Sequence, residues 1–323
     1  MAHWLYGELD AAHAPAALPF AANFGLGSDQ CACVSGLVLS LQGNAITLSR
    51  GLWERGVRDA GTLRQEISRN RGRKTFSFGV VFPYSSHHFL LRQWLKSAEI
   101  DPDADVRVVV VPPAQMFPNL QLGYLDGYCV GEPWTAVAVH AGAGVCVATS
   151  QDLAPLHPEK VLMVRRAYAE ERADEHERLM AALMEACAYC DRPENRVRIS
   201  DCLARPQYID APADCVRAGL AGPFKPGDGR VLSVFGMSIF HRHHANDPTD
   251  GKAAWIIEHL YELLESGATM FPSFARVPVL KNVFRRDVFE RARCVIANEL
   301  NLSEFNKDLA QAKPISERRE IRS

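Results

Sequence analysis

The stretch TFSFGVVFPYSSHHFLLRQWLKS, residues 75–97, decides the fold class of this chain. Residues 75–82 are apolar and suit a strand, the PYSS turn brings two serines that can cap a helix, and residues 87–97 carry apolar side chains at helical spacing. The alternation continues, with strands expected at 106–111, 125–130 and 145–149 and helices at 114–122 and 135–141. Strands that alternate with helices predict an α/β fold whose parallel sheet is covered on both faces.

The flanking segments extend this pattern in both directions. Residues 33–49 predict two strands joined by a turn at Gln42-Gly43-Asn44, and the β-branched run 106–111 predicts a strand buried on both faces. Further expected elements are a surface helix at 59–70, a strand at 160–165, helices at 168–189, 193–204 and 252–266, and a loop at 222–229. The chain therefore changes from α/β alternation to mainly helical structure in its last third.

A length of 323 residues suits about two domains. A short internal repeat agrees, because the pattern G-x-L-D at 7–10 returns at 123–126, each time followed by a proline and an alanine-rich stretch. If the copies mark equivalent places in two lobes, the first lobe lacks its opening segment. We expect residues 1–74 in lobe 1, 75–160 in lobe 2, 161–311 as the return to lobe 1 with the C-terminal helices, and 312–323 as a polar tail.

Composition excludes several classes of protein. The chain is 47% hydrophobic and 23% charged, which is typical of an ordinary globular protein, and its net charge of −2 provides no basic field for nucleic acid or a membrane surface. Its apolar runs are too short to cross a bilayer, and its N-terminus lacks a signal-peptide pattern. Nine scattered cysteines suggest reduced thiols. Together these features predict a cytoplasmic protein that holds any charged ligand locally.

Motifs for metal binding and catalysis are weak. The single CxxC at 187–190 is on an expected helix, where both thiols can be buried, and the HRHH run at 241–244 is followed by Asn-Asp-Pro, which favours a solvated loop. The sequence has no GxSxG elbow, P-loop or HExxH motif. We therefore expect no metal, no cofactor and no enzymatic activity.

An anion site is the stronger hypothesis. Ser85, Ser86 and His87 begin an expected helix, whose free N–H groups and dipole favour a small anion, although simple helix capping explains the same residues. Three further segments bring polar groups, namely the glycine turn at 41–45, the Gly-Glu-Pro-Trp run at 131–134 after a strand, and an ammonium at 157–160. The candidate ligand-binding residues are Gln42, Gly43, Asn44, Ser86, His87, Glu132, Trp134 and Lys160. Singly, each also suits a turn, a cap, a surface ion pair or core packing.

In this order, the segments resemble the nitrate and bicarbonate receptor family of ABC-transporter solute-binding proteins, especially its cytoplasmic nitrate/nitrite-sensor branch. The blocks that carry the resemblance are GELDAAHAPAALP (7–19), LSLQGNAIT (39–47), FSFGVVFPYSSHHFLLRQWL (76–95), VPPAQMFPNLQLGYLDGYCVGEPW (111–134) and SQDLAPLHPEKVLM (150–163). The resemblance implies a type II periplasmic-binding-protein fold, in which two hinged α/β lobes close on an anion. It also implies that Gln42, His87 and Lys160 grip the anion and that the Glu132-Pro133-Trp134 turn lines the cleft.

The ligand implied by the resemblance is nitrate or nitrite. Nitrate carries a negative charge and no proton, so its site should present only hydrogen-bond donors. Bicarbonate has a proton to donate, and bicarbonate-binding relatives place a carboxylate at the position of Lys160. A lysine at this position therefore favours nitrate or nitrite.

The family resemblance also implies a biological role and its alternatives. In the sensor branch, the ligand-free protein holds an RNA-binding antiterminator partner, which binding of nitrate or nitrite releases. Family members begin with a segment that supplies an aromatic ligand contact, and Met1 falls just before the GELDAAH block, so we expect the opening of lobe 1 to be missing. The first alternative is a periplasmic receptor of a nitrate transporter, whose signal peptide would lie upstream. The second is a pyrimidine synthase of the same fold, whose cysteine-rich, histidine-containing motif this sequence lacks.

Overall fold

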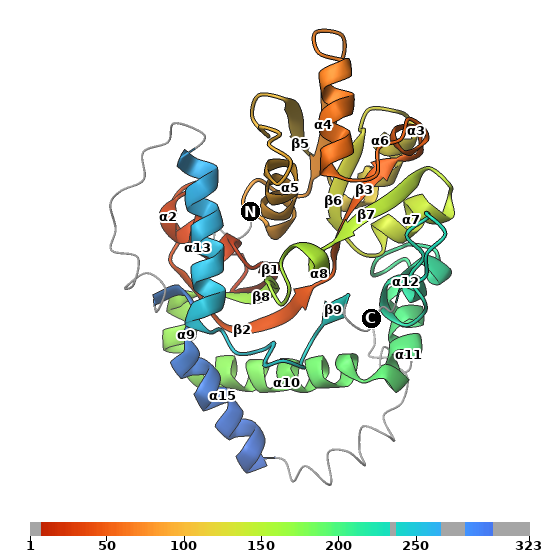
Figure 1. Ribbon diagram of the computed structural model, residues 1–323. Helices are drawn as coiled ribbons and strands as arrows, with labels where there is room; N and C mark the ends of the chain where they lie inside the picture. The colour runs from red at the N-terminus through yellow and green to blue at the C-terminus, as the bar shows by residue number, and fades with distance from the viewer. Residues whose placement is uncertain (1–7, 233–236, 266–281, 300–323) are drawn as a thin grey trace.

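The structure is a computed structural model, and it describes residues 8–232, 237–265 and 282–299. Figure 1 shows two lobes, each built around its own sheet. The expected polar tail at 312–323 lies outside the described residues, as do Met1 and the first glycine of the internal repeat. Within the described part of the chain, no helix is long and apolar enough to cross a membrane.

The first sheet has the strand order β1-β8-β2-β9 and is antiparallel throughout. Its strands are β1 (Ala11–Pro15), β2 (Cys33–Gln42), β8 (Pro158–Arg165) and β9 (Ser238–Ile239). Strand β8 is central, because it pairs with β1 on one side and β2 on the other. The expected parallel sheet is therefore wrong for this lobe, since β8 returns from the second lobe in the direction opposite to β2.

The second sheet has the order β5-β4-β6-β3-β7 and is mixed. Its strands are β3 (Asn44–Ser49), β4 (Phe76–Val80), β5 (Val106–Val110), β6 (Gly127–Gly131) and β7 (Gly144–Thr149). Strand β4 runs parallel to β5 and β6, as predicted, whereas β3 runs antiparallel to β6 and β7. Strand β3 differs because it enters directly from the first sheet, without a helical crossover, and starts where β6 and β7 end.

Strand β5 is the other correction to the predicted sheet. The sequence predicts a strand buried on both faces, but β5 lies at the edge of the sheet and Val110 is 54% exposed. A run of β-branched residues indicates a strand, but it does not specify whether both neighbouring positions in the sheet are filled.

The turn predicted at 42–44 is a passage between the two sheets. Gln42 ends β2 in the first sheet, Asn44 begins β3 in the second, and Gly43 joins them with a φ of 94°. The chain returns between His157 and Pro158, where β8 begins. Sheet membership therefore assigns residues 44–157 to the second lobe, instead of the expected 75–160, and β1, β2, β8 and β9 to the first. The loop around Pro226 packs against β7 of the second lobe.

Helices cover both sheets. They are α2 (Leu18–Phe24), α3 (Arg50–Glu54), α4 (Ala60–Arg69), α5 (Ser86–Lys96), α6 (Pro113–Gln121), α7 (Trp134–His140), α8 (Ser150–Leu153), α9 (Arg166–Glu171), α10 (Ala173–Asp191), α11 (Pro193–Leu203), α12 (Ala213–Leu220), α13 (Asp250–Glu265) and α15 (Arg286–Glu299). The helix expected at 168–189 is divided at Arg172 into α9 and α10. Asp59 and Thr62 form a capping box that begins α4.

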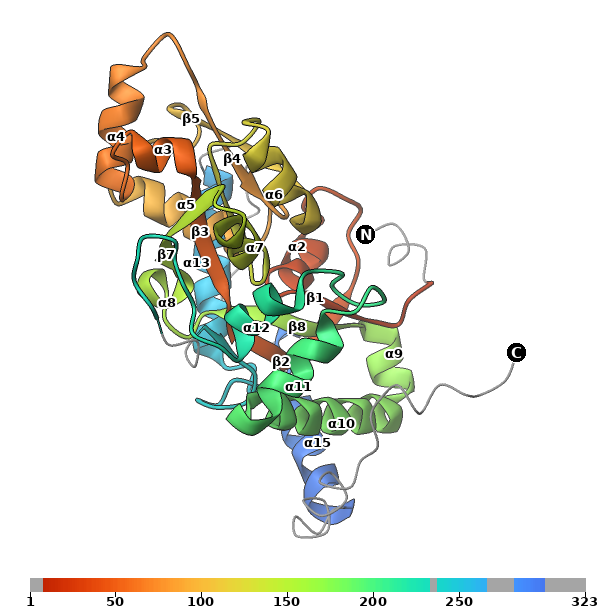
Figure 2. The same cartoon turned by 90° about the vertical axis from the view of Figure 1, so that its right-hand side faces the viewer.

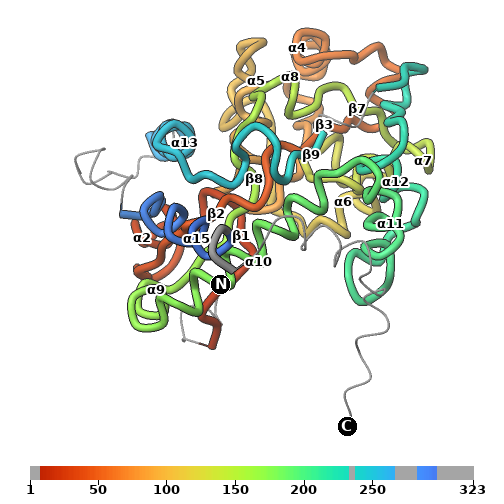
Figure 3. The backbone as a smooth tube through the Cα atoms, turned by 90° about the horizontal axis from the view of Figure 1, so that it is seen from below, coloured from red at the N-terminus to blue at the C-terminus, as the bar shows by residue number. Residues whose placement is uncertain are grey.

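Apolar packing holds the lobes together through their helices. Helices α10 and α15 pack on one face of the first sheet, and Figures 1 and 3 show α10 running across that face. On the opposite face, α2 and α13 share a core with Phe89 of α5, which belongs to the second lobe. Helix α12 packs beside α7 of the second lobe (Figure 2). Helices α12 and α13 therefore contact the second lobe as well.

The passage at Gly43 yields the first prediction. An alanine at this position would have to keep a backbone φ of 94°, and its Cβ atom would lie 2.6 Å from Ser238 Oγ. We expect Gly43→Ala to lower the free energy of unfolding by about 2–3 kcal/mol, through backbone strain and crowding. Gly56→Ala is the matched control, because Gly56 has a φ of 92° with nothing within 4 Å of its Cβ position. Urea denaturation measures both variants, and equal losses would contradict the crowding at the passage.

Candidate functional site

The two passages between the sheets lie side by side. The backbone N–H of Gln42 donates to the His157 carbonyl at 3.1 Å, which joins the first passage to the second. The N–H of Asn44 donates to Ser150 Oγ at 3.2 Å, and the N–H of Glu132 donates to the Gly43 carbonyl at 3.0 Å. The start of β3, the end of β6 and the turn before β8 therefore meet at one point.

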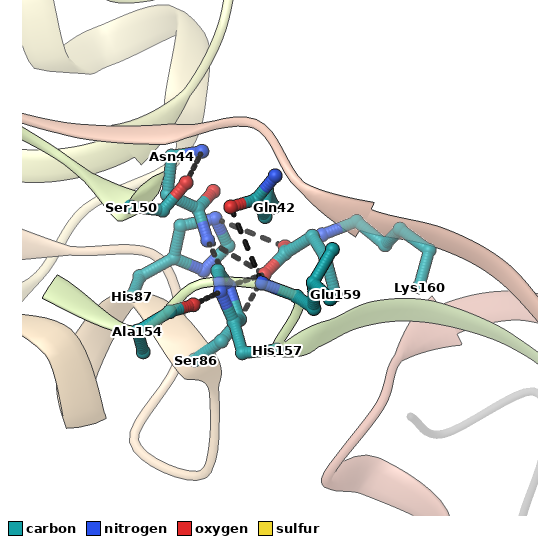
Figure 4. A network of polar contacts seen from close by, with 10 residues as sticks. Gln42, Asn44, Ser86, His87, Ser150, Ala154, His157, Glu159 and Lys160 are labelled. Carbon is teal, nitrogen blue, oxygen red and sulfur yellow. Dashed lines mark hydrogen bonds and ion pairs between the residues drawn. The ribbon is translucent and has the colours of Figure 1, made fainter. Parts of the chain in front are cut away.

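The carboxylate of Glu159 occupies this point (Figure 4). Its Oε2 accepts a hydrogen bond from Asn44 Nδ2 at 2.6 Å and another from Ser86 Oγ, and its Oε1 accepts one from Lys160 Nζ. Asn44 comes from β3, Ser86 from the first turn of α5, and Glu159 and Lys160 from β8. One buried carboxylate thus ties the first lobe to two elements of the second.

Two imidazoles complete the network. His87 Nε2 lies 3.4 Å from Glu159 Oε1, and His157 Nε2 lies 3.7 Å from Oε2. His157 Nδ1 is 2.9 Å from the Ala154 carbonyl, which can only accept, so this nitrogen carries a proton. The His157 ring also contacts Trp255 of α13, with 5.2 Å between the ring centroids and an angle of 38° between the ring planes. His87 Nδ1 is buried and has no hydrogen-bond partner among the described residues.

Electrostatics set the charges in this network. Burial raises the pKa of Glu159, but the ammonium of Lys160 and the two histidines lower it, and the net pKa lies well below its ordinary value. Burial lowers the pKa of His87 to about 4, so this imidazole is neutral at pH 7. At neutral pH, Glu159 and Lys160 therefore carry one negative and one positive charge that balance each other.

The structure brings together only part of the predicted set. The side chains of Asn44, Ser86, His87 and Lys160 all contact Glu159. Gln42, Gly43, Glu132 and Trp134 are the remaining candidates.

Gln42 and Gly43 contribute to the passage between the sheets. Gln42 is buried and has a φ of 61°, and its Oε1 accepts a hydrogen bond from the Leu156 N–H at 3.3 Å. Gly43 contributes a backbone φ of 94°, and its carbonyl accepts the hydrogen bond from the Glu132 N–H.

The side chains of Glu132 and Trp134 are directed elsewhere. Glu132 Oε2 accepts a hydrogen bond from the Ala136 N–H at 3.2 Å, and Glu132 Cβ lies 2.8 Å from the Cβ position of Gly219 in α12. Trp134 packs against the apolar cluster around Tyr128. Among the described residues, neither side chain contacts the Glu159 network, although the backbone of Glu132 is bonded to Gly43. The sequence placed the turn correctly but not its side chains.

Sequence reasoning missed Glu159 and His157. Both stand in the HPEK run at 157–160, of which the candidate set includes only Lys160. The available signal was the Glu-Lys pair at the start of a strand, because a carboxylate beside a lysine in a buried segment must either pair with it or accept other donors.

The expected loop and thiols are present in the structure. Residues 241–246 form turns, in which His241 Nδ1 lies 2.7 Å from Asn246 Oδ1. All nine cysteines are in the described part of the chain and none is in a disulfide. Across residues 8–232, 237–265 and 282–299, no group of three or more His, Cys, Asp or Glu side chains is arranged to hold a metal ion.

Comparison with known proteins identifies relatives. A model of the NMT1-like family matches residues 1–204. The nitrate import ATP-binding protein NrtC of Synechocystis sp. is 36% identical over 287 residues, which cover 88% of this chain and 42% of NrtC. The bicarbonate transport ATP-binding protein CmpC of the same organism is 35% identical over 302 residues, covering 91% of this chain and 44% of CmpC. The chain spans less than half the length of these two relatives.

Solved structures confirm the expected fold class. The periplasmic nitrate-binding protein NrtA from Synechocystis PCC 6803 matches with a TM-score of 0.82 at 23% identity, covering 89% of this chain and 74% of NrtA. The desulfurization enzyme DszB matches with a TM-score of 0.53 at 13% identity, covering 88% of this chain and 85% of DszB. The architecture is the α/β type II periplasmic-binding-protein fold, and at these identities the likeness concerns the fold alone.

The buried carboxyl of Glu132 yields the second prediction. Burial raises its pKa from 4.5 to about 7, so the folded protein holds the proton more tightly than the unfolded chain does. Its contribution to stability is therefore lost as pH rises from 4.5 to 7. We expect Glu132→Gln to be more stable than the wild type at pH 8, by about 1–3 kcal/mol, and equal to it near pH 4. Urea denaturation across this pH range measures the difference in the free energy of unfolding. A difference between the two proteins that stays constant from pH 4 to pH 8 would contradict the raised pKa.

Proposed function

The chain belongs to the NMT1-like family, and from this premise we propose that it binds a small oxyanion, nitrate or nitrite, where the two lobes meet. The observation that carries the proposal is the convergence of Asn44, Ser86, His87 and Lys160 on a single buried carboxylate. Side chains that together hold one monoanion, from both sides of an interlobe junction, are suited to hold another of similar size.

The donors around Glu159 suit a small anion. The network offers an amide, a hydroxyl, an ammonium and an imidazole, and nitrate or nitrite can accept hydrogen bonds from all of them. A hydrogen bond to a charged group contributes about 1.5–3 kcal/mol. Three such bonds, less the costs of desolvation and closure, approach the roughly 8 kcal/mol of a micromolar receptor. Bicarbonate, for which CmpC is named, is the comparison ligand in any experiment.

We propose further that the protein acts as a cytoplasmic sensor that regulates nitrate assimilation through a partner protein. Support comes from the resemblance of its motif blocks to the sensor branch, in which the partner is an RNA-binding antiterminator, and from the similarity to a protein named as the ATP-binding component of nitrate import. The alternative is a solute-binding component of a nitrate transporter. Cell fractionation, with affinity purification in the presence and absence of nitrate, separates the two: a sensor stays in the cytoplasm and releases its partner when nitrate is added.

An enzymatic role has a precedent in the fold, because DszB shares it. The likeness to DszB concerns the fold alone, so it does not extend to an enzymatic activity of this chain.

Lys160→Met tests the binding site. Loss of the ammonium removes one charge-assisted hydrogen bond, so we expect the affinity for nitrate to fall about 10–100-fold in calorimetric titration of the purified protein. Lys74→Met is the matched control, because Lys74 Nζ also pairs with a buried carboxylate, that of Asp126, at 2.5 Å in the second lobe. We expect this control to bind nitrate like the wild type.

The same titration tests the proposed function as a whole. Absence of heat with both nitrate and nitrite, from a wild-type protein that is folded by circular dichroism, would overturn it. Stronger binding of bicarbonate than of nitrate would keep the site and change its ligand.

A further inference from the structure

The carboxylate of Glu159 uses the donors that the proposed ligand needs. Asn44 Nδ2 and Ser86 Oγ donate to its Oε2, whereas Lys160 Nζ donates to Oε1. His87 Nε2 lies 3.4 Å from Oε1. Oε1 thus faces Lys160 and His87, whereas Oε2 faces Asn44 and Ser86, with His157 Nε2 at 3.7 Å.

Glu159 and a bound anion would compete for this space. The Glu159 side chain is 5% exposed, and Lys160 is the neighbouring cation in the network. An anion that entered while the carboxylate stayed in place would put two negative charges beside one ammonium in a poorly solvated site. Simultaneous occupancy is therefore unfavourable, and the ligand can use the donors only after the carboxylate has left them.

We propose that Glu159 is an internal competitor of the ligand, an inference that rests on the proposed function. Its carboxylate fills the anion site until a planar monoanion binds and displaces it. The exchange replaces one flat, forked oxyanion with another, so we expect nitrate, nitrite, bicarbonate and small carboxylates to bind in preference to tetrahedral anions such as sulfate. Because Glu159 lies on β8 and its partners Asn44 and Ser86 on β3 and α5, displacement also releases a bond between the lobes.

The first experiment measures competition. Glu159→Gln keeps the size of the side chain but removes its charge, so the donors lose their internal anion. We expect this variant to bind nitrate at least about tenfold more tightly than the wild type in calorimetric titration. Asp126→Asn is the matched control, because it removes another buried carboxylate that pairs with a lysine, and we expect it to leave nitrate affinity unchanged. Equal or weaker binding by Glu159→Gln would overturn the proposal, since Glu159 would then support the ligand rather than compete with it.

The second experiment is independent of nitrate. Glu159→Ala leaves the donors without a carboxylate, and formate supplies one from solution. We expect formate to raise the melting temperature of Glu159→Ala by several degrees more than that of the wild type, and sulfate at equal ionic strength to give no such difference. An equal response of the two proteins to formate would overturn the proposal. If nitrate binds neither the wild type nor Glu159→Gln, the proposed function fails, and the formate response alone decides whether the donors form an anion site.

Discussion

A buried carboxylate must have donors, and in this protein that requirement joins the two lobes at their junction. Glu159 is at the start of β8, two residues after His157, and it obtains its hydrogen bonds from β3 and α5 of the other lobe. Without these donors and the ammonium of Lys160, the ionised carboxylate would be strongly unfavourable in a buried position. The chemistry of the site therefore depends on this interaction, and the relative placement of the two sheets depends on it together with the apolar contacts that α12 and α13 make with the second lobe.

The fold brings these donors together through the directions of its strands. Strands β6 and β7 end where β3 begins, and the turn after β4 leads to the first residues of α5 at the same edge. Gly131, at the end of β6, has its Cβ position 3.4 Å from Asn44 Oδ1, so the backbone itself forms one wall of the network. Binding at the carboxyl ends of strands is a general property of α/β sheets, and here the same edge also carries both passages between the lobes.

The local elements of the second lobe could be predicted from the sequence because they depend on short-range periodicity. The strand at β4, the helix at α5 and the turn at 131–134 are all present where the pattern indicated them. The antiparallel course of β3 and the edge position of β5 could not be predicted in the same way, because both depend on which strands lie beside them. Similarly, Glu132 and Trp134 lie at the expected turn, but the contacts of their side chains depend on the tertiary structure. Glu132 packs against Gly219 of α12, and Trp134 packs against the apolar cluster around Tyr128.

The sequence by itself determined the α/β fold class, the passage of the chain at Gly43 as a turn, and four of the donors at the candidate site, since these follow from residue type and spacing. Only the tertiary structure decided that the turn crosses between sheets and that Glu159 is the centre of the donor set. The reason is physical: a donor is recognised from its own chemistry, but the group that it serves depends on which side chains become neighbours when segments more than a hundred residues apart, such as Asn44 and Glu159, are buried together.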